Sequence, residues 1–113
     1  IRDSNEVTYP FDLVDPDGIE AEVRRLARSV ARRLRDSSLL CRTVRIKIRY
    51  PDFRTVTRQV RLGVGIDSEG LIETVAVYLL RERVALDEQG VRLIGVGAAH
   101  LAETTARQLP LFE

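Results

Sequence analysis

The side chains with the greatest capacity for chemistry are basic and lie close together in the chain. Between residues 41 and 62 there are seven arginines and lysines and one acidic residue, a local net charge of +6. The whole 113-residue chain carries only +1, so the other residues together carry −5. Because arginine and lysine attract phosphates and carboxylates, this asymmetry predicts an anion-binding face rather than an evenly solvated surface.

The residue types that usually carry catalysis or bind metals do not form a pattern. Asp67, Glu69 and Glu73 come nearest to a carboxylate cluster, but a helix start explains them as caps and first-turn acids. His100 is the only histidine, and no serine, cysteine or acid has a spacing that would pair with it for nucleophilic work. Cys41 is the only cysteine, which excludes an internal disulfide and a zinc-binding set. We expect no catalytic residue, metal ligand or cofactor in this segment.

The composition is typical of one soluble globular domain. Hydrophobic residues make up 44% and charged residues 31% of the chain. No apolar run approaches the roughly 18 residues of a membrane span. We therefore expect a cytoplasmic monomer without membrane contacts. Since the chain opens with Ile1-Arg2-Asp3 and has no initiator methionine, it is interpreted as a fragment of a longer protein.

Two helices are predicted from their starts and their apolar spacing. Asp15 followed by Pro16 is a favourable start, because the aspartate accepts free backbone N–H groups and proline has none to lose. Apolar residues then recur at spacings of three and four to about residue 35. A second helix is expected from Asp67 or Ser68 towards residue 85. The arginines on the outer side of the first helix are interpreted as a solvated face.

Alternation of apolar and polar residues predicts strands between and beside these helices. Residues 43–62 form a predicted hairpin with its turn at Pro51-Asp52, and shorter strands are expected over 6–11 and 91–98. The order β-α-β-β-α-β favours an α+β fold, a four-stranded sheet with two helices on one face and the other face open. We expect residues 1–103 to form the domain and residues 104–113 to be a flexible tail.

Two strands contain details that bear on which side chains are displayed. In the first strand Val7, Tyr9 and Phe11 alternate with Glu6, Thr8 and Pro10, and a proline is tolerated only at a sheet edge or a strand end. In the hairpin Arg58 has the same parity as the apolar residues Val56 and Val60, which a bulge or an edge position would explain.

The open face is predicted to display hydroxyl and basic side chains at strand spacing. They are Thr43, Arg45, Lys47, Arg49, Thr57 and Arg61. Such side chains neutralise and hydrogen-bond phosphates without reading sequence. Gly95 and Gly97 have no Cβ and can let a nucleic-acid backbone approach the strand, although packing or a bulge would equally explain them.

The hairpin carries a resemblance to a known family. The run from Arg42 to Arg58, with its turn and strand Asp52-Phe53-Arg54-Thr55-Val56-Thr57-Arg58, resembles the little finger hairpin of bacterial Y-family DNA polymerases of the DNA polymerase IV type. Residues 6–11 and 91–96 are similar to the first and fourth strands of the same domain. The resemblance covers nearly the whole chain, from about Asn5 to Leu101.

This resemblance implies a non-catalytic domain whose open sheet face grips primer–template duplex DNA across the major groove. The residues that it assigns to DNA are Thr8, Arg45, Lys47, Thr57, Arg58, Arg92 and the backbone at Gly95. Many relatives have arginine where this chain has Leu93 and Gly97, so the grip of that strand is expected to rely on backbone amides. The magnesium-binding carboxylates of such polymerases belong to a catalytic domain that these residues do not include.

The end of the chain carries a second resemblance. The segment Gln108-Leu109-Pro110-Leu111-Phe112 is similar to the peptide by which bacterial replication proteins bind the sliding clamp. The resemblance assigns Gln108, Leu109, Leu111 and Phe112 to pockets of the clamp. Pro110 departs from the usual serine or aspartate and is expected to alter affinity or stiffen the peptide. A frayed apolar end is the alternative interpretation.

Two other functions fit parts of the pattern. A ferredoxin-like regulatory or oligomerisation module would use the basic sheet for a small anion or another subunit. A single-stranded RNA binder would need exposed aromatic residues on the open face, whereas Tyr50 lies on the buried parity. The predicted function is duplex DNA binding within a lesion-bypass polymerase, with the tail bound to the clamp.

Overall fold

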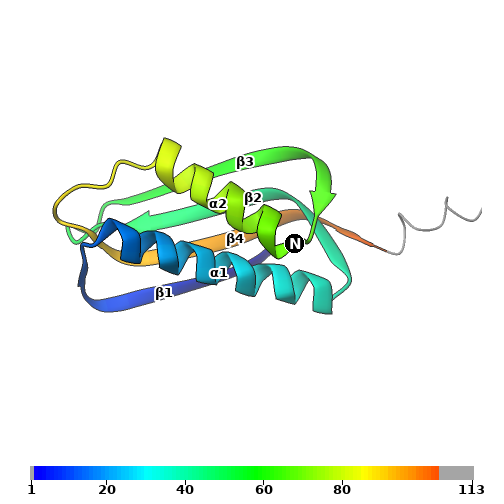
Figure 1. Cartoon of the computed structure of the whole chain (residues 1–113), viewed down its shortest axis with the longest axis horizontal. Coiled ribbons are helices and arrows are strands. Elements are labelled where there is room, and N and C mark those ends of the chain that lie inside the picture. The colour runs from blue at the N-terminus through cyan, green and yellow to red at the C-terminus, as the bar shows by residue number, and fades with distance from the viewer. Residues whose placement is uncertain (1, 105–113) are drawn as a thin grey trace, which may run out of the picture.

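The computed structural model describes residues 2–104 of the chain. The elements follow in the order β1 (Arg2–Leu13), α1 (Pro16–Asp36), β2 (Leu39–Arg49), β3 (Thr55–Ile66), α2 (Glu69–Arg83) and β4 (Val91–Glu103). The strands form one antiparallel sheet in the order β1-β4-β2-β3. Both helices lie across the same face of this sheet (Figure 1). The predicted α+β fold, with helices on one face and the other face open, is confirmed.

Local caps begin both helices where the sequence predicts them. The Asp15 side chain accepts a hydrogen bond from the backbone N–H of Asp17, and Pro16 occupies the first turn. The Ser68 side chain accepts from the N–H of Leu71. The second helix ends at Arg83, two residues before the predicted end, because Val84 has extended backbone angles.

The apolar stripe of each helix packs on alternate residues of the central strands. The largest fully buried side chains come from both helices and from β2 and β4: Ile19, Val23, Leu26, Val30, Leu34, Val44, Ile46, Ile48, Ile72, Leu79, Val91 and Ile94. The alternation in β2 therefore places every second side chain in the core and turns the residues between them to the opposite face. This arrangement fixes which basic residues the sheet can present.

The first strand is longer than predicted and irregular near its end. Its regular pairing with β4 stops at Thr8 and resumes at Leu13, so the intervening residues are free of a fixed alternation. Tyr9 is buried, and its hydroxyl donates to Glu22 over 2.6 Å. Phe11, which has the same parity as Tyr9 in the sequence, is 56% exposed. Pro10 lies in this irregular part of an edge strand, where a missing N–H costs little.

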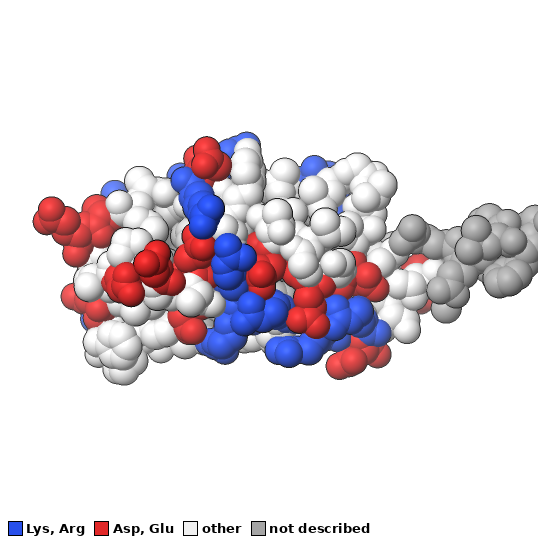
Figure 2. Space-filling view, in the orientation of Figure 1, with Lys and Arg blue, Asp and Glu red and all other residues white. Residues whose placement is uncertain are grey.

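The helix face is covered by paired charges. Seven ion pairs connect arginines of α1 and α2 to acids of α1, α2 and β1; the arginines are Arg24, Arg25, Arg28, Arg33, Arg35 and Arg81. Figure 2 shows basic and acidic groups interleaved on this side of the molecule. Over residues 2–104 no helix is long and apolar enough to cross a membrane.

Candidate nucleic-acid interface

The face of the sheet away from the helices, here called the open face, is built from three cross-strand rows. Read from β3 to β1, the rows are Thr55–Arg49–Leu93–Thr8, Thr57–Lys47–Gly95–Glu6 and Gln59–Arg45–Gly97–Ser4. Antiparallel partners point to the same side of a sheet, so these side chains share one surface. Predicted binding residues from three different strands, Thr8, Lys47 and Thr57 among them, are thereby brought together.

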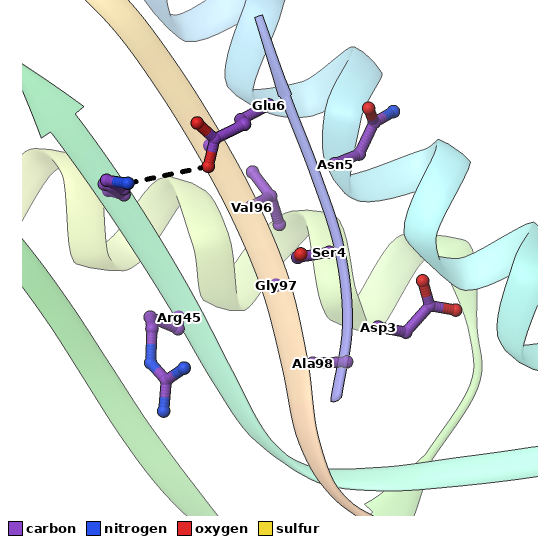
Figure 3. A pocket seen from close by; sticks show the side chains of 10 residues that line it. Asp3, Ser4, Asn5, Glu6, Arg45, Val96, Gly97 and Ala98 are labelled. Carbon is purple, nitrogen blue, oxygen red and sulfur yellow. Dashed lines mark ion pairs between the residues drawn. The ribbon is translucent and has the colours of Figure 1, made fainter. Parts of the chain in front are cut away.

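The open face is hollowed where β4 has glycines. A depression of about 270 Å³ lies between β1 and β2 and is lined by Ser4, Glu6, Arg45, Lys47, Gly95 and Gly97, among others. In Figure 3 Ser4 and Glu6 lie on the side of β1 that faces this depression, and Asp3 and Asn5 point away from it. A Cβ at Gly95 would lie 3.1 Å from the Cβ of Glu6, so a side chain there would crowd the depression. The absence of a Cβ at Gly95 therefore leaves this space open, although Gly95 itself is buried.

The basic residues of the open face have few acidic partners. Arg45 donates to the Gln59 amide oxygen over 2.9 Å, and Arg49 donates to the Thr55 hydroxyl over 3.0 Å. Lys47 makes one long ion pair, 3.6 Å from Nζ to the Glu6 carboxylate. This contrasts with the helix face, where six arginines are bound to carboxylates at 2.6 to 3.1 Å. The open-face cations therefore keep more of their capacity for an external anion.

Thr43 belongs to the same side of β2 but is not displayed. It pairs with Arg61 and Ala99, yet its side chain is only 1% exposed. His100 covers it, with Nδ1 2.6 Å from the Thr43 hydroxyl, and has a positive φ of 55°. The prediction of an exposed Thr43 is therefore wrong, because a change in the backbone of β4 turns the imidazole onto this threonine. Arg61 is exposed as predicted.

Thr8 and Arg92 lie together at one end of the open face. With Arg49, Phe53 and Leu93 they line a second hollow beside the turn of the hairpin. Arg92 donates to the backbone oxygen of Tyr9 over 3.0 Å and lies 3.3 Å from the carboxylate of Asp12. Its guanidinium is thus held against β1, at the rim of the face.

Arg58 points to the other side of the sheet. Its register partner Ile46 is a core residue under the helices, so the parity conflict in the sequence is real. Because β3 is an edge strand, the Arg58 side chain can extend past the edge of the sheet instead of into the core. It donates a hydrogen bond to the backbone oxygen of Arg83 at the end of α2 over 2.9 Å. The edge position explains the parity, and Arg58 is not one of the residues that the open face brings together.

The residues considered as catalytic candidates are occupied by ion pairs or buried in the fold. Glu73 bridges Arg24 and Arg28, and Glu69 pairs with Arg35. Burial raises the pKa of the Cys41 thiol to about 11, which keeps it protonated at neutral pH. In the described part of the chain no three histidine, cysteine or acidic residues are grouped to hold a metal ion.

Sequence reasoning missed four polar residues of the open face: Ser4, Glu6, Thr55 and Gln59. The amide of Gln59 orients Arg45, and Glu6 lies opposite Lys47 across Gly95. The alternation of apolar and polar residues already indicated that Glu6 and Gln59 are exposed. The contact of Glu6 with Lys47, however, depends on β4 lying between β1 and β2. The sequence contains no local signal for that strand order.

Comparison with known proteins agrees with the geometry. The model of the family described as the impB/mucB/samB family C-terminal domain matches residues 4–111. The chain therefore belongs to this family. It is a little finger domain of the DNA polymerase IV type, and the resemblance seen in the sequence is confirmed.

Curated relatives of this little finger domain are named DNA polymerase IV. The protein of Streptomyces coelicolor is 40% identical over 107 residues, which are 94% of this chain and 22% of that protein. The protein of Corynebacterium diphtheriae is 38% identical over 110 residues, covering 96% and 23% of the two chains. The domain thus spans about a quarter or less of the length of these relatives.

Solved structures share the fold of this little finger domain. A complex of β-clamp processivity factor and the little finger domain of PolIV matches with a TM-score of 0.68 and 24% identity, over 88% of this chain and 87% of that one. A post-insertion binary complex of Dbh DNA polymerase matches with a TM-score of 0.76 and 20% identity, over 91% and 29%. The predicted clamp-binding residues Gln108, Leu109, Leu111 and Phe112 lie outside the described residues.

Proposed function

We propose that this domain binds primer–template duplex DNA as the non-catalytic, C-terminal part of a lesion-bypass DNA polymerase. The open face carries the proposal, because Arg45, Lys47, Arg49 and Thr57 share one uncovered surface with few acidic partners. Cationic and hydroxyl groups of this kind contact phosphates and position a duplex without reading its sequence. The names of the relatives, DNA polymerase IV, support the same function.

Nucleotide transfer and its magnesium ions would belong to the rest of the parent protein. The described residues do not fit such an ion, since no cluster of acids is present among them. The contribution of this domain is to hold the duplex, and its own side chains take no part in bond formation.

Salt dependence of duplex binding tests the proposal. Phosphate contacts release counterions, so affinity should fall steeply between about 50 and 200 mM salt. Unrelated duplexes should bind with similar affinity, because the candidate contacts are directed to phosphates. A domain that instead self-associates, with a salt-insensitive interface and no DNA binding, would be the regulatory or oligomerisation module.

We also propose that Gln108, Leu109, Leu111 and Phe112 bind a bacterial sliding clamp. The sequence of this segment supports the proposal, and so does the similarity to a little finger domain of PolIV that was solved in complex with a β-clamp processivity factor. Apolar anchors such as leucine and phenylalanine commonly dominate the binding energy of a small interface.

Truncation separates this function from DNA binding. Removal of residues 108–113 should abolish binding to a bacterial clamp and leave the melting temperature and duplex affinity nearly unchanged. A peptide of residues 104–113 should compete with the full chain for the clamp. If the truncated chain still binds the clamp, the contact lies on the folded body. A large fall in melting temperature would show that the tail packs against the core.

A further inference from the structure

Glu6 is the one acidic residue in the three rows of the open face. It lies in the middle row, on β1, at the edge of the depression that Arg45 and Lys47 border on β2. Asp3, on the same strand, points away and pairs with Arg33 of α1 (Figure 3). Among the acids of β1, Glu6 is thus the one whose side chain turns toward the cations of the open face.

The contact between Glu6 and Lys47 depends on the glycine between them. Gly95 pairs with Glu6 on one side and with Lys47 on the other, so the two charged residues are two strands apart. They nevertheless approach to 3.6 Å, over the position where Gly95 has no side chain. A Cβ there would lie 3.1 Å from that of Glu6 and 3.5 Å from that of Lys47. In Figure 3 the Glu6 side chain reaches from β1 over β4, and the dashed line that marks this ion pair ends at its carboxylate.

We propose that Glu6 competes with DNA phosphate for Lys47 and thereby limits the affinity of the open face for duplex DNA. This inference rests on the proposed function. The carboxylate and a phosphate are both anionic acceptors, and one ammonium group cannot serve both fully. The pair is long and its side chains are 36% and 48% exposed, so a phosphate can displace it at small cost. A weakened contact also releases the duplex sooner, because affinity within one interface is set mostly by the rate of dissociation.

Glu6→Gln tests the competition with a change that keeps the size of the side chain. The variant of the full chain should bind a mixed-sequence duplex about two- to fivefold more tightly at low salt. The salt dependence should become steeper by up to about one unit of slope, since Lys47 is then free to neutralise a phosphate. Glu82→Gln is the matched control, because Glu82 is exposed on α2 and its loss changes the net charge equally. This control should leave affinity nearly unchanged.

The same substitution in a Lys47→Ala background identifies the route of the effect. If Glu6 acts through Lys47, Glu6→Gln should give little or no gain once Lys47 is absent. An equal gain in both backgrounds would mean direct repulsion of DNA, and an equal gain from Glu82→Gln would mean a net-charge effect; either result overturns the competition.

The outcome also separates this inference from the proposed function. If Arg45→Ala/Lys47→Ala weakens duplex binding but Glu6→Gln does not strengthen it, the competition is wrong and the interface stands. If the open-face substitutions leave duplex binding unchanged, both are wrong. Melting temperatures should match throughout, because Glu6 and Lys47 lie on the surface of the sheet.

Discussion

At the scale of single residues, the turn of the hairpin holds an aromatic side chain in an unfavourable backbone conformation. Phe53 has a φ of 70° and is 83% exposed, so the fold gains little from its ring. A left-handed conformation costs an L-residue about 1–2 kcal/mol, and glycine avoids this cost. Phe53→Gly should therefore raise the free energy of unfolding by up to about 1 kcal/mol, since the greater freedom of the unfolded glycine offsets part of the gain. Urea unfolding measures this, and a clear loss of stability would show that the ring is packed.

Residue-scale features were predictable where the signal is local. Asp15 and Ser68 cap their helices as expected, because a cap acts on N–H groups two or three residues away. The bond between Thr43 and His100 was not predictable, because it joins positions far apart in sequence and depends on a positive φ at a non-glycine residue. An alternating pattern gives no sign of such a change in direction.

At the scale of elements, Arg58 connects the edge strand to the end of α2. A cation at a helix C-terminus is stabilised by the free carbonyl groups and the helix dipole. Arg58→Ala should lower the free energy of unfolding by about 0.3–1 kcal/mol and change duplex affinity little. Denaturant unfolding and a DNA titration on the same samples check both parts. A large loss of duplex affinity without a change in the free energy of unfolding would show that Arg58 contacts DNA, as the family resemblance implies.

The elements themselves follow from periodicity, whereas their arrangement does not. Spacings of three and four in the helices and of two in the hairpin reflect burial on one side, so type and approximate bounds could be predicted. The extension of β4 to Glu103 and the irregular end of β1 depend on pairing between distant strands. Phe11 shows the consequence, because it shares the parity of the buried Tyr9 and is nevertheless exposed beyond the register change.

At the scale of the whole molecule, charge is sorted between two faces. The helix face holds six of its arginines in ion pairs with carboxylates, and the open face leaves Arg45 and Arg49 to neutral partners. The charge count over residues 41–62 predicted this asymmetry but overstated the size of the basic surface. Arg54 of that stretch stacks over the Tyr50 ring at 4.4 Å, and Arg58 binds the end of α2.

Duplex binding by Arg45→Ala/Lys47→Ala is the most direct test of the open face as the DNA interface. If the open face holds the duplex, affinity should fall about tenfold for every duplex sequence and the salt slope should decrease by about one or two units. The control, Arg32→Ala/Arg83→Ala, removes two exposed charges from the helices and should leave both quantities nearly unchanged. Unchanged affinity and slope in the open-face variant, or an equal loss in the control, would show that the open face is not the DNA interface.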